Sequence, residues 1–148
     1  MESKAEAVWS GDLMTGKGTT TARTSGIFKE AALSWKSRAE AAGPGNTTPE
    51  ELLAASHASC FAMAFSHGLA AGKTPAQKLE VQATVTFGPK AGGGGFEVKS
   101  SALEVKGWVK GIDQAAFATA AEAAKDGCPI SLALKNNVAM SVKATLQA

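Results

Sequence analysis

The sequence predicts a single domain that combines β-strands with α-helices, and three observations support this. The chain has 148 residues, the length of one domain, and 45% of them are hydrophobic, which is enough to bury a core. Several segments alternate apolar and polar residues, as strands with one buried face do. Between them lies a long run of helix formers that is apolar on all sides, which is typical of a buried central helix.

The first third of the chain predicts short strands separated by glycines. β-forming residues and alternation occur in residues 5–10, 18–24 and 32–37, with Gly11 and Gly26 among the glycines between them. Short strands that follow one another in this way are usually neighbours in space. We therefore expect an antiparallel meander in this part of the chain.

The central helix is the best-marked element, and we expect it to run from Pro49 to about Ala71. Thr48 precedes a proline at the first helical position, and Glu51 follows three residues after the threonine, which is the pattern of a capping box. The helix is expected to end at residues 72–75, because this segment contains both a glycine and a proline.

The C-terminal half predicts three strands and two helices. Two alternating strands are joined by a glycine-rich hairpin, which lacks the strand-to-helix context of a phosphate-binding loop. Asp113 caps an alanine-rich helix that is followed by Gly127, and Pro129 opens a short second helix. The expected strands are residues 79–87, 96–109 and 138–146, and the expected helices are residues 114–125 and 129–135.

Charge and composition exclude several classes of function. The formal net charge is +2 and the basic residues are scattered singly, so we expect no nucleic-acid partner. Residues 1–7 lack the pattern of a secretory signal, and no apolar run approaches membrane-spanning length. We therefore expect a cytoplasmic protein with no membrane partner, in which a disulfide would be transient and catalytic rather than permanent.

The two cysteines are the strongest functional clue. Cys60 lies in the middle of the central helix, and Cys128 lies between Gly127 and Pro129, where we expect it to be the N-cap of the short helix. The positive end of a helix dipole favours a thiolate at such a position. The two thiols suit an attacking and resolving pair if they come within disulfide reach. The alternative for Cys128 is a small buried residue at a tight turn.

Arg38 is the candidate for a cation that stabilises the Cys60 thiolate. The chain has only two arginines, and Arg38 stands at the end of a predicted strand, just ahead of the central helix. A fixed guanidinium could stabilise a thiolate and also hydrogen-bond the leaving oxygen of a peroxide. A solvated surface arginine is the alternative.

Glu50 is the carboxylate that could hold Arg38 in place. It precedes Cys60 by ten residues, which is about 15 Å along a helix. Glu50 therefore cannot easily reach the cysteine of its own chain. Either Glu50 only favours the helix N-terminus through the dipole, or it serves the cysteine of a neighbouring subunit.

Two histidines on the central helix raise the question of another chemistry. His57 lies three residues before Cys60 and His67 seven residues after it, so we expect all three on one helical face. A Cys-His dyad for acyl transfer lacks an evident third group, and a packed histidine is the alternative for His57. A metal site from His57, Cys60 and Cys128 has too few ligands at a recognisable spacing, so we expect no metal.

Four segments of the sequence resemble those of one known family. TPEELLAASHASCF (residues 48–61) and GCPIS (127–131) are similar to the two motifs of the osmotically inducible protein C and organic hydroperoxide resistance family. VWSGD (8–12) and KGTT (17–20), together with His57 and an arginine at position 38, resemble the osmotically inducible branch. The resemblance covers essentially the whole chain.

The resemblance implies a cysteine-based peroxidase that reduces organic hydroperoxides, and hydrogen peroxide less well. It implies that Cys60 forms a sulfenate, that Cys128 resolves it as a disulfide, and that Arg38 and Glu50 are the activating pair. It implies an α+β intertwined homodimer, in which sheets from both chains wrap central buried helices and each site lies at the subunit interface. No metal, haem or flavin cofactor is implied.

The resemblance also suggests a dithiol as the reductant, such as a lipoylated protein, with a thioredoxin-type donor as the alternative. Leu53, Phe61, Met63 and Phe65 could line a pocket for the alkyl group of the substrate, or they could form the helix core. Two other functions stay open at this point. One is a thiol redox sensor or stress-induced binding protein without turnover, and the other is a Cys-His acyl hydrolase.

Overall fold

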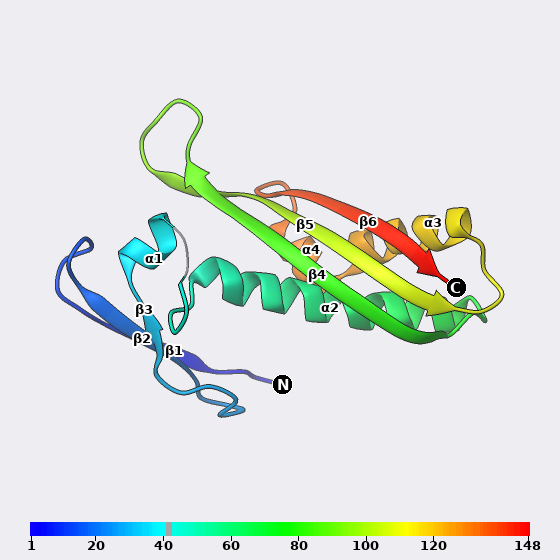
Figure 1. Cartoon of the computed structure of the whole chain (residues 1–148), viewed down its shortest axis with the longest axis horizontal. Helices are drawn as coiled ribbons and strands as arrows, with labels where there is room; N and C mark the ends of the chain where they lie inside the picture. The colour runs from blue at the N-terminus through cyan, green and yellow to red at the C-terminus, as the bar shows by residue number, and fades with distance from the viewer. Residues whose placement is uncertain (41–42) are drawn as a thin grey trace. The chain divides into compact units, whose positions relative to one another are not determined.

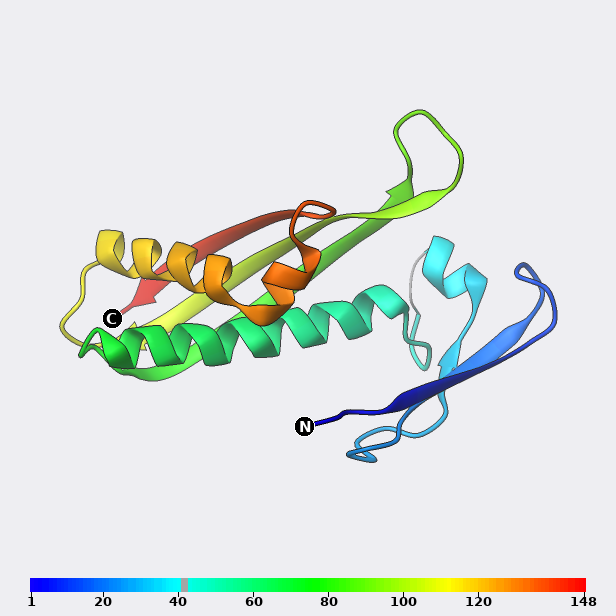
Figure 2. The ribbon, with the colours of Figure 1, turned by 180° about the vertical axis from the view of Figure 1, so that it is seen from behind.

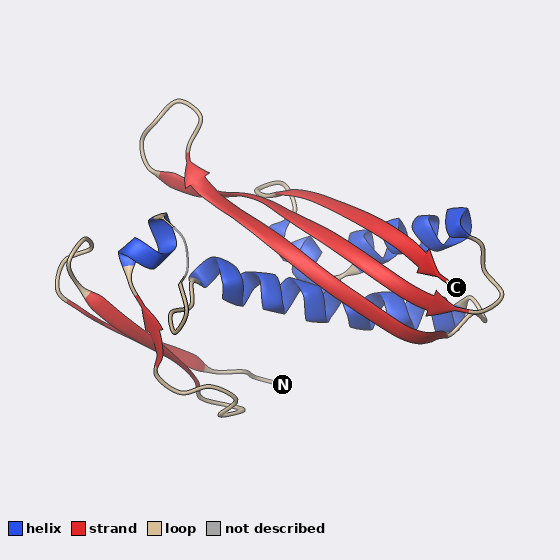
Figure 3. Ribbon diagram, in the orientation of Figure 1, coloured by secondary structure: helices blue, strands red, loops and turns tan. Residues whose placement is uncertain are grey.

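The computed structural model describes residues 1–40 and 43–148 (Figure 1). Within it the chain forms two compact units, Met1–Leu52 and Leu53–Ala148. Helices and strands occur in both units, as expected for the α+β class (Figure 3). None of the described helices is both long enough and apolar enough to cross a membrane.

The first unit contains the predicted antiparallel meander. Strands β1 (Ala5–Ser10), β2 (Lys17–Ala22) and β3 (Ala31–Leu33) lie side by side in that order, and both pairs are antiparallel. The prediction of one strand over residues 32–37 is wrong at its C-terminal end. Ser34 ends the extended segment because its hydroxyl accepts a hydrogen bond from the Ser37 N–H, which caps a short helix, α1 (Trp35–Ala39). Arg38 therefore lies on a helix and not at the end of a strand.

The central helix α2 (Pro49–Ala71) has the predicted boundaries. The Thr48 hydroxyl accepts a hydrogen bond of 3.1 Å from the Glu51 N–H, which is the first half of the expected capping box. The Glu51 carboxylate accepts a hydrogen bond of 2.6 Å from the Thr47 hydroxyl. At the other end, Lys73 adopts a positive φ of 61°, and this left-handed residue terminates the helix.

The second unit is built on a three-stranded sheet with the order β4-β5-β6. A long antiparallel hairpin forms its first two strands, and the last strand pairs with β5 in parallel. The helices α2, α3 and α4 lie on one face of this sheet (Figure 2). The bounds are β4 (Ala76–Pro89), β5 (Phe96–Val109), α3 (Gln114–Gly127), α4 (Pro129–Leu134) and β6 (Ala139–Gln147).

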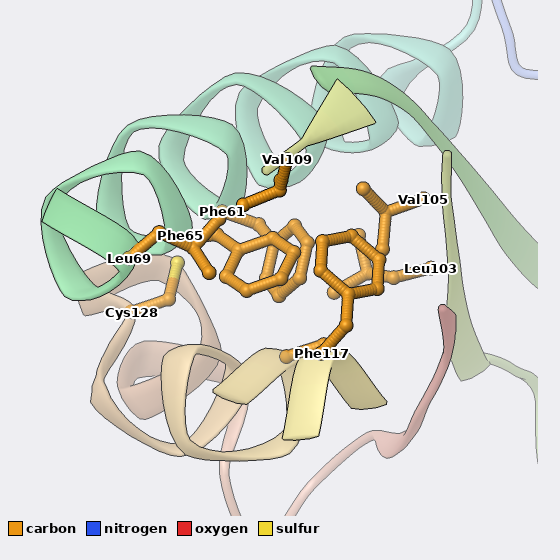
Figure 4. Close-up of a cluster of buried hydrophobic side chains, with 9 residues drawn as sticks. Phe61, Phe65, Leu69, Leu103, Val105, Val109, Phe117 and Cys128 are labelled. Carbon is orange, nitrogen blue, oxygen red and sulfur yellow. The ribbon is translucent and has the colours of Figure 1, made fainter. Parts of the chain in front are cut away.

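The core of the second unit fills the space between α2, α3 and β5 (Figure 4). Phe65 of α2 packs between Phe61 and Phe117, with ring centroids 5.5 Å and 5.0 Å apart. Gly107 of β5 allows this packing, because a Cβ atom there would lie 2.3 Å from the Phe117 ring. The buried members are Phe61, Phe65, Leu69, Leu103, Val105, Val109, Phe117, Ala121 and Cys128.

Only one side of α2 is covered by its own chain in this second unit. Phe61, Phe65 and Leu69 are buried, whereas Met63 is 68% exposed. The exposed side also carries small residues such as Ser59 and Ser66. The expectation that α2 is buried all round is therefore wrong for the single chain.

Candidate active site

The fold brings the two cysteine thiols together. Cys60 lies on α2, and Cys128 lies at the junction of α3 and α4, where it is the N-cap residue that the sequence predicts. The Cys128 Sγ donates a hydrogen bond of 3.1 Å to the Cys60 Sγ, and both thiols are free. A disulfide needs about 2.05 Å between sulfurs, so a shift of about 1 Å would close the bond. Figure 4 shows the Cys128 sulfur pointing toward α2.

The two thiols differ in their access to solvent. Cys128 is 0% exposed and belongs to the hydrophobic core, whereas Cys60 is only partly buried. A molecule from solution can therefore reach Cys60 but not Cys128. The expectation of a small buried residue at a turn is correct for Cys128, and it does not exclude a role in chemistry.

The pKa values of the two thiols shift in opposite directions. Burial raises the pKa of Cys60, the hydrogen bond with Cys128 adds to this, and the Ile130 N–H opposes it. Burial also acts to raise the pKa of Cys128, but its hydrogen bonds with Ser131, Cys60 and Ile130 outweigh it, and the net shift is downward. Hydrogen bonding therefore favours the thiolate of Cys128, whereas burial disfavours the thiolate of Cys60.

Arg38 and Glu50 form an ion pair within the first unit. The Arg38 Nη2 lies 2.8 Å from the Glu50 Oε1, and the Arg38 Nε lies 3.2 Å from each carboxylate oxygen. The Glu50 side chain is 9% exposed and that of Arg38 is 33% exposed. This forked contact fixes the plane of the guanidinium, as a single hydrogen bond would not.

An apolar cavity of about 280 Å³ lies beside Arg38 in the same unit. Two tryptophans are among its lining residues, and Arg38 is the one cationic residue among the described residues that line it. For four residues the sequence left open a substrate pocket or the helix core. Phe61 and Phe65 form the core, Leu53 is half-buried, Met63 is exposed, and none of them lines this cavity. The lining residues are Trp9, Leu13, Leu33, Ser34, Trp35, Arg38, Thr47 and Pro49.

His57 is fully buried and hydrogen-bonds two serine hydroxyls. Its Nδ1 lies 2.7 Å from the Ser101 Oγ of β5, and its Nε2 lies 2.9 Å from the Ser131 Oγ of α4. Burial lowers the pKa of His57, so the ring is neutral near pH 7. Both ring nitrogens are thus engaged by serines, and His57 forms no Cys-His dyad.

His67 does not share the environment of His57. It is exposed, although it lies two helical turns after Cys60 on the continuous helix α2 and so shares the face of Cys60 and His57, as expected. Ser101 and Ser131 are the residues that sequence reasoning missed. The signal available for Ser131 was its place in the GCPIS segment beside Cys128, whereas the alternation of β5 could show only that Ser101 faces inward.

Comparison with known proteins gives one consistent result. The sequence profile of the family described as OsmC-like protein matches residues 42–143. The chain is 36% identical to a peroxiredoxin OsmC of Escherichia coli over 141 residues, which are 95% of this chain and 94% of that protein.

Solved structures are similar over almost the whole chain. The organic hydroperoxide resistance protein OhrB of Bacillus subtilis superposes with a TM-score of 0.73 at 26% identity, covering 96% of this chain and 98% of that one. An OsmC-like protein of Mycoplasma pneumoniae gives a TM-score of 0.72 at 16% identity, with coverage of 100% and 99%, and this likeness concerns the fold alone.

Proposed function

Because this chain belongs to the family of OsmC-like proteins, with a peroxiredoxin among its relatives, we propose that it is a cysteine-based peroxidase that reduces organic hydroperoxides. The observation that carries the proposal is the 3.1 Å contact between the sulfurs of Cys60 and Cys128. A solvent-accessible thiol with a second thiol in disulfide reach is the arrangement that a two-cysteine reduction needs.

The reaction proceeds in three steps. The Cys60 thiolate attacks the terminal oxygen of the hydroperoxide, the O–O bond breaks, and Cys60 becomes a sulfenic acid. The alkoxide takes up the proton that the Cys60 thiol had released and leaves as the alcohol. The Cys128 sulfur then attacks the Cys60 sulfur, the S–O bond breaks, and water leaves. A dithiol finally reduces the Cys60–Cys128 disulfide by thiol exchange and is itself oxidised to a disulfide.

Accessibility assigns the two roles. Peroxide cannot reach Cys128, which is 0% exposed, so Cys60 is the thiol that meets the substrate. The downward shift in the pKa of Cys128 suits the second step, in which it attacks as a thiolate. Burial raises the pKa of Cys60, so a cation beside the thiol would promote the first step. No cation is among the groups that act on Cys60 in the described part of the chain.

Arg38 is that cation, and it acts on the Cys60 of a partner subunit. Glu50 holds Arg38, and Glu50 and Cys60 are ten residues apart on the continuous helix α2, about 15 Å along its axis. Two copies of the chain bring the pair of one to the thiol of the other. The exposed side of α2, with its small residues and Met63, is the surface on which a second copy would pack to form the homodimer.

The apolar cavity beside Arg38 favours organic hydroperoxides over hydrogen peroxide. Its walls of Trp9, Trp35 and leucine side chains would bury an alkyl or aryl group while the guanidinium binds the peroxide oxygens. Hydrogen peroxide has no such group and would gain only the polar contact.

We propose a dithiol as the reductant, such as a lipoylated protein. Its first thiol would attack the Cys60–Cys128 disulfide, and its second thiol would complete the exchange and free both cysteines. A cytoplasmic location would supply the reducing conditions that keep both thiols free.

The geometry disfavours the acyl hydrolase, because both nitrogens of His57 bind serine hydroxyls and neither is left for Cys60.

Repeated consumption of hydroperoxide distinguishes a peroxidase from a redox sensor. We expect the wild-type protein to consume cumene hydroperoxide continuously with dihydrolipoamide, with two thiols lost per peroxide. We expect Cys60→Ser to abolish this consumption and Ser141→Ala, a change at an exposed residue of β6, to retain it. A single equivalent consumed by the wild type would identify a sensor instead.

A further inference from the structure

A continuous chain of hydrogen-bonding side chains leads from the buried sheet to the resolving cysteine. The Ser101 hydroxyl contacts the His57 Nδ1, and the His57 Nε2 contacts the Ser131 hydroxyl. Ser131 is the third residue of α4, whose N-cap is Cys128, and its hydroxyl is among the hydrogen-bonding groups that lower the pKa of Cys128. Ser101, His57, Ser131 and Cys128 are each at most 2% exposed, so water does not compete for these contacts.

The direction of these hydrogen bonds follows from the number of protons available. A neutral imidazole donates from one nitrogen and accepts at the other, and a serine hydroxyl donates only one proton. If the Ser131 proton points to the Cys128 thiolate, the Ser131 oxygen must accept from the His57 Nε2–H. The His57 Nδ1 must then accept from the Ser101 hydroxyl. If the proton of His57 were on Nδ1 instead, Ser131 would donate to Nε2 and have no proton left for the thiolate.

We propose that His57, held as the neutral Nε2–H tautomer by Ser101, is a positioning residue that directs the Ser131 hydroxyl proton onto the Cys128 thiolate for the resolving step. This inference deepens the proposed peroxidase function and rests on it. In that step the Cys128 thiol loses its proton, the S–S bond to Cys60 forms, and the S–O bond of the sulfenic acid breaks. The thiol proton and the departing hydroxide leave together as one water.

No charged side chain competes with this arrangement in the described residues. The side chains of Glu104 and Lys106 on β5 are exposed and alternate with the buried Leu103 and Val105, so they point to the opposite face of the sheet. On α3, Lys125 forms ion pairs with Glu122 and Asp126. On α2 the other histidine, His67, is exposed, and Cys60 is the only titratable group that acts on Cys128.

The first test measures the ionisation of Cys128 without any peroxide. In a Cys60→Ser background, Cys128 is the only thiol, and its titration can be followed by the ¹³Cβ chemical shift. We expect Ser131→Ala to leave about tenfold less thiolate at a given pH, because a hydrogen bond to a charged sulfur is lost. Ser131→Thr, which keeps the hydroxyl, should restore the titration, and Ser141→Ala at an exposed position of β6 should not alter it. An unchanged titration in Ser131→Ala would overturn the proposal.

The second test reads the tautomer in the unmodified protein and so needs no variant that must fold. ¹⁵N spectra of the imidazole should show a neutral His57 with its proton on Nε2. A proton on Nδ1, or a doubly protonated ring at pH 7, would overturn the proposal. In His57→Gln the amide N–H can replace the Nε2–H that donates to Ser131. We therefore expect this variant to form the Cys60–Cys128 disulfide from the sulfenate faster than His57→Leu, with a pH dependence closer to that of the wild type.

These tests separate the inference from the proposed function. If the wild type does not turn over hydroperoxide, the peroxidase proposal is wrong, and the titration and the tautomer still report on the hydrogen-bond chain. If the wild type turns over hydroperoxide, and Ser131→Ala forms the disulfide with an unchanged pH profile, only the proposed role of the hydrogen-bonded side chains is wrong.

Discussion

The thiol of Cys128 donates a hydrogen bond to the thiol of Cys60 across 3.1 Å, although the two residues are 68 positions apart in the chain. One of these sulfurs is accessible and the other is sealed in the core. In the cycle that we propose, this asymmetry, rather than the two pKa values alone, assigns Cys60 to the substrate and Cys128 to the second step.

Removal of the buried thiol should stop the cycle after one reduction. We expect Cys128→Ser to reduce one equivalent of hydroperoxide, because Cys60 remains accessible, and then to hold a Cys60 sulfenate that excess peroxide converts to sulfinate. Mass spectrometry of the treated variant should show the added oxygens on Cys60. An unmodified Cys60 in that variant would contradict the division of roles.

Two inactive variants should restore activity when they are combined in one dimer. Cys60→Ser lacks the nucleophile, and Glu50→Ala releases Arg38, so each homodimer should be inactive. A heterodimer formed by co-refolding should contain one intact site, because the thiol comes from one chain and the Arg38–Glu50 pair from the other. Differently tagged chains allow the heterodimer to be purified and assayed.

The complementing experiment has a built-in control. A heterodimer of Cys60→Ser with the double variant Cys60→Ser/Glu50→Ala has no nucleophile and should stay inactive. No recovery in the verified first heterodimer would mean that Glu50 works within its own chain or has no part in the reaction.

The cavity beside Arg38 should determine the preference for organic peroxides. We expect Trp35→Ala to raise KM for cumene hydroperoxide roughly tenfold, because an apolar wall is lost, and to change the reaction with hydrogen peroxide much less. Steady-state kinetics with both substrates give the ratio. Trp108→Phe, in the second unit and outside the cavity, should leave the ratio unchanged, and an equal loss for both peroxides in Trp35→Ala would argue against a binding pocket.

His57 should make the fold less stable in mild acid. Burial lowers its pKa in the folded state below the ordinary value of 6.5, so below pH 6.5 the unfolded chain binds a proton that the folded chain does not. The free energy of unfolding therefore falls as pH falls, by at most about 1.4 kcal/mol per pH unit from this residue. Urea denaturation at pH 7.5 and 5.5 should show that His57→Gln loses less stability than the wild type. His67→Gln, which removes the exposed histidine of α2, should behave like the wild type.

Gly107 and Phe117 should be coupled energetically. An alanine Cβ at position 107 would lie 2.3 Å from the Phe117 ring, and such overpacking costs about 1–3 kcal/mol. Phe117→Ala alone should cost about 3–5 kcal/mol through the cavity that it leaves. In the double variant the clash is absent, so Gly107→Ala should cost clearly less than in the wild type. Gly127→Ala, where no atom lies within 4 Å of the added Cβ, serves as the control.

Most of the secondary structure could be predicted from the sequence alone. The limits of α2 followed from Thr48, Pro49 and Gly72, and the start of α3 followed from Asp113, because capping residues act on their nearest neighbours in the chain. The strands of the hairpin followed from alternation, which also depends only on neighbouring residues. The prediction was wrong at Trp35, where three residues of β3 precede a helix capped by Ser34, because a short segment has too few residues to distinguish the two periodicities.

The sequence by itself determined the candidates for the site and their chemistry: two thiols, an arginine and a glutamate. Only the tertiary structure decided which groups meet, because contacts between distant residues arise from packing and not from local preference. It placed Cys60 against Cys128, set Arg38 on Glu50 beside an apolar cavity, and joined His57 to Ser101 and Ser131. The serines carry no motif that marks a partner 44 or 74 residues away, and their role followed only once the core had brought them to the two imidazole nitrogens.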